Sequence, residues 1–582
     1  MTIGTFPKPL HITLLLIALT VVSAAANLIL GLNPEPPALT TMGLEAEQDL
    51  LMPPMVINST DDTGPTPTPP PAGGRQFYVS PQGRPNGDGS QTNPWNIWKA
   101  IVTPGVVPAG STVYLRGGTY SMDPNPQPDR VLWEIAGTAV QPIIVRNYPG
   151  ERAIIDLDWL VEFSGNYVHY WGLEFITSRT EKTFAGGWAN GIPGAISFAG
   201  KGNKLINCVL HDAHGASLFK VASDMEMYGN IMYYHGLIAQ ERSWGTTAYV
   251  QNSVGYKKIY DNIMFQQFNH NLQIYGSDAA TLKDISMVGN TLFSAGTLGT
   301  NPGWNAVVWV GAIPAERITF SDNYVYAPPL PDITWTTPNV IMWGSRESTN
   351  TDLVFTGNRI VRGYPPVRLA RWSPATFTDN TIVGEAGNIL AAGIVGLDIT
   401  LVPNGQYNWN NNRYHQGAAG YQFQYPGGYY DFAGWKVVTG LDTNSTYSAS
   451  RPTGMDISVR PNQYEQGRAH ITILNWDNVA TANVNLSTAG LTNGQQYQIK
   501  DAQNFFGPSI YSGTYSSSSP TITITLPGAG SPVSPIIGAN NPWNFGGSPG
   551  GNPYIDRNGA PLRLKLPVHT AIEFNAFVLL PR

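Results

Sequence analysis

The chain has little charge and almost no cysteine. Only 12% of its 582 residues are Asp, Glu, Lys or Arg, which is about half the share in an ordinary globular protein. Few long charged helices can be built from such a composition. The net charge of −6 is spread without a basic stripe, which argues against nucleic acid as a partner. The one cysteine, Cys208, cannot form an internal disulfide, and its apolar surroundings INCVL predict a buried thiol.

What the chain has instead is glycine, proline and aromatic residues. It contains 62 Gly, 47 Pro, 16 Trp and 28 Tyr. Many short β-branched and aromatic runs lie between turn residues, which is typical of an all-β protein.

The N-terminus predicts export. Residues 1–32 carry Lys8 and His11 ahead of a long apolar run that contains SAAAN, so a signal peptide cut near Ala26 is one interpretation. The run is also about long enough to span a bilayer, and an uncleaved membrane anchor is the other. Both place the rest of the protein outside the cytoplasmic membrane. Residues 33–74 end in GPTPTPPPAGG and predict an extended linker.

A short pattern recurs along the middle of the chain, in which Gly or Asp often precedes an Asn and an apolar run follows. Successive copies lie 22 to 35 residues apart. A fixed element with variable insertions indicates a solenoid. Because each copy has short strands and no helical period, the sequence predicts a parallel β-helix in which each Asn adopts left-handed backbone angles at a tight bend and the Asn side chains ladder from coil to coil. The Asn residues are Asn207, Asn230, Asn262, Asn290, Asn323, Asn358, Asn380 and Asn412.

These repeats, with the opening segments FYVSPQGRPNGDGSQTNPWNIWKAI, GSTVYLRGGTY and PIIVRNYPGERAIID, resemble the right-handed parallel β-helix proteins of the pectate-lyase-like superfamily, of the exported carbohydrate-active type. The resemblance covers about residues 75–450 and implies that WNIWKAI is a short helix over the open first coil. DFAGWKVVTGLDTNSTY resembles the closing segment of such enzymes. Residues 451–582 lose the Asn repeat and alternate with period two, which predicts a separable C-terminal β-sandwich.

One sheet of the predicted β-helix is a candidate substrate-binding face. The strands GAISF, ASLFK, AYVQN, LQIYG, VVWVG, VIMWG and VRLAR stack in register. Aromatic rings in an outward row stack on sugar faces, and amides and cations bind hydroxyls and carboxylates; the alternative is that the rings pack beneath loops. The predicted substrate-binding residues are Tyr249, Gln251, Gln273, Tyr275, Trp309, Trp343, Arg368 and Arg371.

The loops just before this sheet carry the candidate catalytic groups. HDAHG, YYHGLIAQERSWG and QFNHN come from consecutive coils, so their side chains should converge; the alternative is that the histidines are structural turn residues. A lysine one strand beyond HDAHG serves as a base if it is desolvated. The predicted catalytic residues are His214, Lys220, His235, Glu241, Arg242 and His270.

The surplus of cations in these loops favours an acidic polysaccharide as the partner, cleaved by a lyase that removes the proton beside a uronate carboxylate. The resemblance implies a Lys or Arg base, with or without Ca²⁺. No metal-ligand spacing is diagnostic. A glycoside hydrolase stays open, with Asp212 and Glu241 as the one loop pair of carboxylic acids, although the paired-Asp and Gly-His-Gly motifs of the polygalacturonate hydrolases are absent. A non-catalytic, carbohydrate-binding surface protein is the third hypothesis. The chain is expected to be a monomer.

Overall fold

The computed structural model describes residues 74–582, apart from 123–129, 158–159, 185–194, 214–216, 220–221, 240–242, 301–305, 330–338, 364, 385–396, 416–422, 426–427, 546–554, 556–558 and 560. The predicted export segment and nearly all of the predicted linker lie outside the described residues. Within the described residues, no helix combines the length and the apolar character that crossing a membrane requires.

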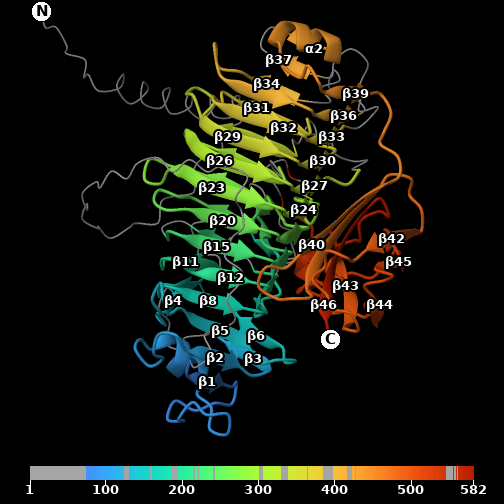
Figure 1. Cartoon of the computed structure of the whole chain (residues 1–582). Helices are drawn as coiled ribbons and strands as arrows, with labels where there is room; N and C mark the ends of the chain where they lie inside the picture. The colour runs from blue at the N-terminus through green and yellow to red at the C-terminus, as the bar shows by residue number, and fades with distance from the viewer. Residues whose placement is uncertain are drawn as a thin grey trace, which may run out of the picture. The chain divides into compact units, whose positions relative to one another are not determined.

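Three parallel sheets form a β-helix between residues 76 and 448, as the sequence predicts (Figure 1). The first sheet contains β1 (Gln76–Val79), β2 (Thr112–Leu115), β5 (Ile143–Asn147), β8 (Val168–Trp171), β12 (Lys204–Ile206), β15 (Met225–Tyr228), β20 (Lys257–Tyr260), β23 (Leu282–Val288), β26 (Ala315–Ser321), β29 (Thr351–Thr356), β32 (Ala375–Thr378) and β35 (Tyr407–Asn410). The second sheet contains β3 (Gly118–Ser121), β6 (Ala153–Asp156), β9 (Glu174–Ile176), β13 (Val209–His211), β16 (Ile231–Tyr233), β21 (Ile263–Phe265), β24 (Thr291–Phe293), β27 (Tyr324–Tyr326), β30 (Arg359–Val361), β33 (Thr381–Val383), β36 (Arg413–His415) and β39 (Thr446–Ser448).

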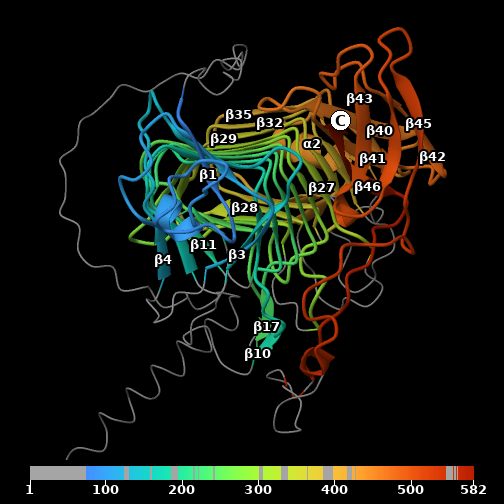
Figure 2. The ribbon, with the colours of Figure 1, turned by 90° about the horizontal axis from the view of Figure 1, so that it is seen from below.

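The third sheet contains the strands predicted to bind substrate. It consists of β4 (Arg130–Trp133), β7 (Leu160–Phe163), β11 (Ile196–Phe198), β14 (Ser217–Phe219), β19 (Ala248–Val250), β22 (Leu272–Tyr275), β25 (Val308–Gly311), β28 (Val340–Gly344), β31 (Val367–Ala370), β34 (Leu397–Thr400), β37 (Phe423–Tyr425) and β38 (Gly428–Tyr430). Only β38 is antiparallel to its neighbour among these described strands. Figure 2 shows the coils along the direction in which they stack.

Two short helices cover the ends of the solenoid. Segment η1 (Trp98–Val102), a single π-helical turn, buries Ala100 and Ile101 at the N-terminal end, where the resemblance implies a helix. Helix α2 (Phe432–Thr439) lies at the C-terminal end and stacks Trp435 on Phe423 of β37. A terminal coil without such a cover exposes its core and a strand edge.

The predicted ladder of asparagines is confirmed. The side chain of Asn230 donates to Asn262 Oδ1 at 2.8 Å, and that of Asn262 donates to Asn290 Oδ1 at 3.0 Å. Each Oδ1 also accepts the backbone N–H of the preceding Asn. The same pair of bonds continues through Asn323, Asn358, Asn380 and Asn412.

Two details of the prediction are wrong. The left-handed backbone belongs to the residue before each ladder Asn, as at Gly229 with φ 69° and Asp261 with φ 54°. Asn207 occupies that preceding position, with φ 52°, and the ladder position of its coil is held by Cys208, whose N–H donates to Asn230 Oδ1 at 2.9 Å. Glycine and short polar residues adopt positive φ at low cost, which explains the Gly, Asp or, before Asn412, Asn that precedes each ladder Asn.

Replacing Asn262 with Leu is expected to lower the free energy of unfolding by about 1–3 kcal/mol, because the backbone N–H of Asn230 and the carbonyl of Met227 then lose a buried partner. Chemical denaturation measures the loss. Asn410→Ala, at a partly exposed position outside the ladder, is the control and should cost less. Equal losses in the two variants would show that the ladder contributes nothing beyond an ordinary surface turn.

The C-terminal region forms antiparallel sheets, as predicted for residues 451–582. One sheet contains β40 (Met455–Pro461), β41 (Ala469–Asn475), β46 (Phe574–Pro581), β43 (Gln496–Asp501) and β44 (Ser509–Thr514), and a second pairs β42 (Thr481–Asn485) with β45 (Thr521–Thr525). Their inner faces enclose one apolar cluster of their own. Two single turns, η3 (Ala502–Asn504) and η4 (Pro542–Phe545), lie in the connections.

The sandwich and the solenoid also share a core. The outward face of the second sheet carries a stack in which the rings of Tyr233, Phe265 and Phe293 are 5.1 and 5.0 Å apart, and Phe574 of β46 continues it at 5.0 Å from Phe293. Glu573 accepts hydrogen bonds from the solenoid residues Tyr326 and Arg362. Separation of the two regions therefore exposes an apolar stripe.

A chain that ends at residue 450 is expected to aggregate, because the stripe along the second sheet would face water. Replacing Phe265 and Phe293 with Ser in that shortened chain should restore part of its solubility. Size-exclusion chromatography and circular dichroism measure both results. A monomeric, folded 75–450 chain without these substitutions would instead establish the sandwich as separable, as the sequence predicts.

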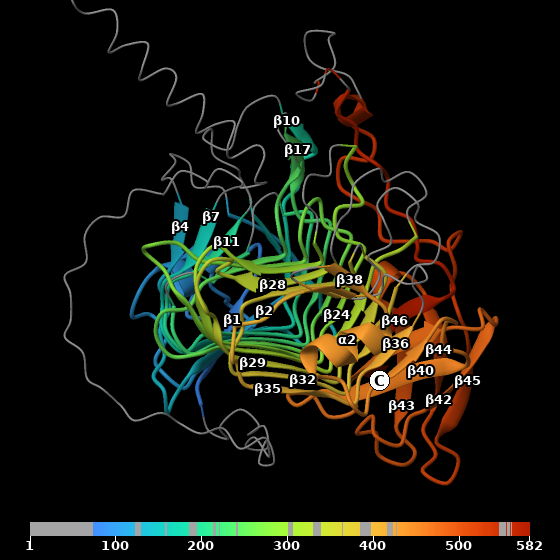
Figure 3. The same cartoon turned by 90° about the horizontal axis from the view of Figure 1, so that it is seen from above.

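A small three-stranded sheet projects from the coils near the candidate catalytic loops. It consists of β10 (Thr183–Phe184), β17 (Leu237–Ala239) and β18 (Ser243–Trp244). Figures 2 and 3 show β10 and β17 beside the segment that contains η4, and the N–H of Lys182 donates to Asn544 Oδ1 at 2.7 Å.

Candidate functional site

The outer face of the third sheet carries the predicted row of side chains in register. Tyr249 pairs with Gln273, Gln273 with Trp309, and Trp309 with Ile341, which in turn pairs with Arg368. Because side chains alternate along a strand, residues two positions along the same strands face the same way. These include Tyr275 and Trp343, which the sequence also assigns to this face.

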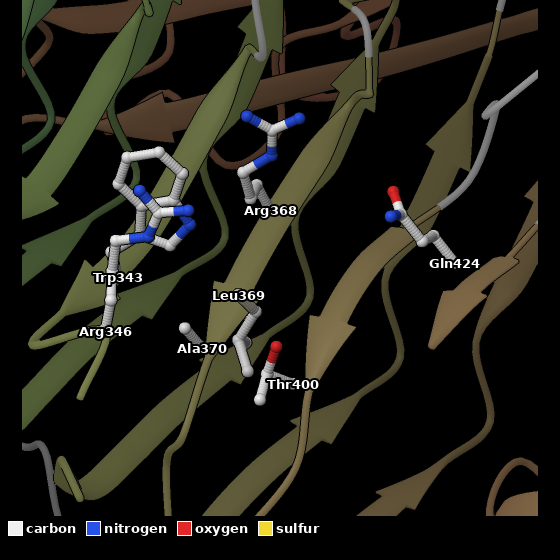
Figure 4. A pocket seen from close by; sticks show the side chains of 7 residues that line it. All are labelled: Trp343, Arg346, Arg368, Leu369, Ala370, Thr400 and Gln424. Carbon is white, nitrogen blue, oxygen red and sulfur yellow. The ribbon is translucent and has the colours of Figure 1, made fainter. Parts of the chain in front are cut away.

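A cavity of about 330 Å³ opens beside Trp343 near the C-terminal end of this face. The guanidinium carbon of Arg346 lies 4.4 Å from the centroid of the indole, and that of Arg368 lies 5.5 Å from it. Figure 4 shows these three side chains, with Gln424 two strands farther along the sheet. An aromatic face between two arginines suits a sugar ring that carries a carboxylate. The lining residues are Trp343, Arg346, Arg368, Leu369, Ala370, Thr400 and Gln424.

The predicted row is less accessible in its middle part. Trp309 is only 5% exposed, because it packs with Ala306, Ile341 and the edges of neighbouring rings. Gln251 is also buried, and its amide donates to the Tyr275 carbonyl at 2.8 Å. The expectation that these two side chains face the substrate directly is therefore wrong for the described structure. Trp309 instead packs edge-on with Tyr275 and Trp343, with ring centroids 5.5 and 6.4 Å away.

The remaining residues of the row are half-buried. Tyr249, Gln273 and Arg368 keep part of their surface accessible. Arg371 is half-buried at the end of β31, with a φ of 54°, but it is not among the residues that line the cavity.

Two of the predicted catalytic histidines are buried. His235 is fully enclosed and its Nε2 donates to the Leu210 carbonyl at 3.2 Å; burial lowers its pKa to about 3, so it is neutral at ordinary pH. His270 is 1% exposed, donates from Nδ1 to the Ala306 carbonyl at 2.8 Å, and packs edge-on against Trp309 at 5.1 Å. The expectation that these rings face an open cleft is wrong, because both serve to fix loop backbone.

The other four predicted catalytic residues, His214, Lys220, Glu241 and Arg242, lie outside the described residues. Their backbone neighbours are described. Strand β14, which ends one residue before Lys220, pairs with β11 and β19 of the third sheet. Strands β17 and β18 flank Glu241 and Arg242 and pair with each other.

A chain of charges, buried except for Arg152 at its end, lies where the HDAHG loop begins. Lys182 is fully buried, and its Nζ lies 3.1 Å from Asp212 Oδ1 and donates to the Asp212 carbonyl at 3.1 Å. His211 joins Asp212 to Glu174: its Nδ1 lies 2.9 Å from Asp212 Oδ2, and its Nε2 lies 2.9 Å from Glu174 Oε1. Arg152 then binds Glu174 through both Nε and Nη2. Cations and anions alternate through five residues.

The geometry makes His211 an imidazolium. Both ring nitrogens face carboxylate oxygens, and a carboxylate only accepts, so both nitrogens must donate. Burial opposes the charge, but the hydrogen bonds that the ring donates to Asp212 and Glu174 outweigh it and raise the pKa of His211 above its ordinary value of 6.5. The ring also stacks on Tyr233 at 4.8 Å.

Replacing His211 with Gln is expected to cost about 1.5–3 kcal/mol of unfolding free energy at low pH, the scale of hydrogen bonds to charged groups. Because the folded pKa is raised, the stabilisation is complete below the unfolded value near 6.5 and is lost as the pH rises through the folded pKa. Denaturation of both proteins from about pH 5 to about pH 9 measures the difference. A difference that stays constant or grows with pH would contradict a charged His211.

The structure provides no clear metal centre among the residues that it describes. No group of three or more His, Cys, Asp or Glu in the described ranges is arranged to hold an ion. Three or more carboxylate or carbonyl ligands are the ordinary requirement for Ca²⁺. Of the carboxylates considered for Ca²⁺, Glu241 lies outside the described residues, so the expectation of Ca²⁺ stays a prediction.

Residues 77–248 match the family described as Pel9A-like, right handed beta helix region. Over these residues the chain is similar to pectate-lyase-like β-helix proteins. It is 40% identical over 80 residues to pectate lyase PEL9 of Emericella nidulans, covering 14% of this chain and 18% of that protein. It is 35% identical over 108 residues to pectate lyase L of Thermoclostridium stercorarium, covering 18% of this chain and 8% of that one. The chain thus spans less than a fifth of the length of either curated relative.

Among solved structures, a rhamnogalacturonan lyase aligns with a TM-score of 0.36 at 14% identity, over 58% of this chain and 87% of the other.

Sequence reasoning missed three of the residues that make these sites. Glu174 stands in the apolar run GLEFI, and a carboxylate within a buried strand signals a paired cation. The sequence around Lys182 gives no sign that this lysine is buried, because it lies in the polar run SRTEKT. Arg346 follows the strand VIMWG by two residues, and only the turn geometry brings it back over Trp343.

Proposed function

We propose that the protein is an exported, monomeric polysaccharide lyase that cleaves a uronate-containing chain by β-elimination. The observation that carries the proposal is the indole of Trp343 between Arg346 and Arg368 on the outer face of the third sheet. The family match over residues 77–248 and the partial sequence similarity to two pectate lyases support this class of substrate.

The substrate would lie along the third sheet. Neighbouring strands are about 4.8 Å apart, so a polysaccharide that crosses them meets Tyr249, Gln273 and Tyr275 before it reaches Trp343. A sugar face stacks on the indole, and a carboxylate binds the guanidinium of Arg368 or Arg346. Arginine gives a planar pair of donors that matches a carboxylate.

The chemistry would take place at the loops that precede this sheet. A base, for which Lys220 is the candidate, removes the proton on the carbon beside the uronate carboxylate. Arg242, or Ca²⁺ if one is bound, neutralises the negative charge that develops on the carboxylate. The electron pair then forms a carbon–carbon double bond and expels the glycosidic oxygen, which takes up a proton and becomes a new hydroxyl.

A panel of polysaccharides tests the proposal. Polygalacturonate, alginate and a neutral galactan are incubated with the full chain, and the ultraviolet absorbance of unsaturated products is followed together with the number of reducing ends. Absorbance that rises with reducing ends on an acidic polymer supports the lyase. Reducing ends without absorbance would establish a hydrolase, and binding without either would establish a carbohydrate-binding surface protein.

The dependence on metal is tested in the same assay. Activity that EDTA removes and Ca²⁺ restores would place an ion at the loops, and activity indifferent to EDTA would assign the charge neutralisation to Arg242.

A further inference from the structure

A second cavity, of about 480 Å³, lies where the first sheet turns into the second and the C-terminal sandwich approaches. Arg146 and Trp171 come from β5 and β8 of the first sheet, and Glu174 comes from β9 of the second. Arg468 precedes β41, and Phe506 follows η3. None of the cavity's residues lines the cavity beside Trp343.

Arg468 supplies a buried charge that is poorly compensated. Its side chain is 8% exposed, and its one ion pair among the described residues is with Glu465 at 3.5 Å, the limit of a useful contact. Nε and Nη2 have no hydrogen-bond partner among the described residues. Glu465 is also shared, because it accepts from Asn207 at 3.1 Å. A buried cation with so little compensation raises the potential at the cavity wall.

Arg146 supplies a second cation. Its guanidinium carbon lies 4.7 Å from the centroid of Trp171, and no carboxylate pairs with it among the described residues. Its Nε also lacks a hydrogen-bond partner there. A guanidinium held flat on an indole keeps its outer donors available in a fixed plane.

Two of the three carboxylates that line the same cavity, Glu174 and Glu151, are already neutralised by other cations. Glu174 is bound by Arg152 and His211. Glu151 is bound by Arg116, whose Nε and Nη2 donate to it at 2.9 and 2.7 Å. The third, Glu465, faces Arg468 at 3.5 Å, so the excess positive charge in the cavity rests chiefly on Arg146.

Aromatic surface completes the site. Phe506 is 40% exposed although it is a large apolar side chain. The guanidinium carbon of Arg152 lies 3.7 Å from the centroid of its ring and holds the ring in place. Trp171 is fixed by Tyr464, with ring centroids 5.8 Å apart. Rigid aromatic surface next to unpaired cations is the combination that recognises a charged sugar.

We propose that this cavity is a second glycan-binding site, separate from the third sheet, which binds a carboxylate-bearing sugar unit of an acidic polysaccharide. Arg146 and Arg468 attract and hold the carboxylate, and the ring packs against Phe506 and Trp171. A site of this kind keeps the polymer attached to the protein while another part of it occupies the third sheet, which raises the local concentration of substrate there. The binding does not depend on cleavage.

The test uses the full chain carrying Trp343→Ala, which weakens binding to the third sheet. Isothermal titration calorimetry with a short oligogalacturonate should still detect binding. Adding Arg146→Gln should weaken that binding about tenfold or more, the scale of one charge-assisted hydrogen bond, and Phe506→Ser should weaken it as well. Arg84→Gln, an exposed arginine in the N-terminal turn, is the matched control and should leave the affinity unchanged.

Three results would overturn the inference. The first is the absence of binding in the Trp343→Ala chain while the wild-type chain binds, which leaves the third sheet as the one site and the proposed function intact. The second is equal affinity for a neutral galactose oligomer of the same length. The third is that inorganic phosphate binds as tightly as the oligogalacturonate with the same dependence on Arg146, which would define a simple anion site.

Discussion

The variant Lys182→Met is expected to lose about 3–5 kcal/mol of its free energy of unfolding, the cost of leaving one partner of a buried ion pair without its counter-charge. Lys182 and Asp212 are both fully buried, and the ammonium contacts both the carboxylate and the backbone carbonyl of Asp212. Methionine fills nearly the same volume, so the loss reports charge rather than a cavity. Urea denaturation at neutral pH measures it.

The matched control is an exposed pair elsewhere in the solenoid. Arg317 binds Asp284 at 2.6 and 2.8 Å, but both side chains face water. Arg317→Met should therefore cost at most about 1 kcal/mol. The double variant Lys182→Met with Asp212→Asn should recover part of the loss, because the stranded charge is removed. A Lys182→Met protein as stable as the Arg317→Met protein would mean that water reaches the buried pair.

Lys220→Ala and Arg242→Ala are each expected to lower turnover by a hundredfold or more, the scale of one general base or one charge-stabilising group. Trp343→Ala should instead raise KM and leave kcat nearly unchanged, because the indole binds the ground state and the transition state alike. Initial rates of product absorbance on the best polymer of the panel give both constants, with circular dichroism to confirm folding.

These three variants distinguish the catalytic role proposed for the loops from the substrate-binding role proposed for the third sheet. His235→Ala serves as a further comparison, because His235 is buried and neutral. This variant should lower the free energy of unfolding but leave the turnover of the folded protein nearly unchanged. If Lys220→Ala and Arg242→Ala both keep wild-type turnover, the reacting groups lie elsewhere on the chain. If Trp343→Ala lowers kcat as much as they do, the indole belongs to the reacting centre.

The solenoid could be predicted because its information is local and repeated. Nearly every coil repeats a residue with left-handed backbone angles followed by a buried Asn. Apolar side chains alternate along each strand, so the strands can be recognised in the sequence. The assignment failed at Asn207, where two asparagine roles stand side by side and Cys208 takes the ladder position. A single copy of the motif cannot show which of its two residues turns the backbone. The positive φ values of Gly229 and Asp261 show that it is the first of the two.

The candidate site could be predicted only in part. Alternation places Tyr249, Gln273 and Trp343 on one face, because strand geometry alone decides that. Burial depends on what covers the face, and the loops that enclose Trp309 and His270 are not encoded in the strand pattern. The pairing of Lys182 with Asp212 and of Arg146 with Trp171 joins segments from different coils, which no periodicity in the sequence can reveal.

The asparagine ladder has a direction, and this direction decides which kind of group must stand at its C-terminal end. Every amide donates toward the next coil, so the series must end on a group that accepts and offers nothing further. That group is Asp442, whose carboxylate accepts from Asn412 at 3.0 Å and also from Tyr414 and Trp435. If a whole coil is duplicated between Asn262 and Asn290, every side-chain amide of the ladder still finds an acceptor in the next coil. Lengthening by such duplication is therefore compatible with the fold. A coil added beyond Asp442 receives no side-chain hydrogen bond from it, because a carboxylate accepts and does not donate, so Asp442 ends the ladder.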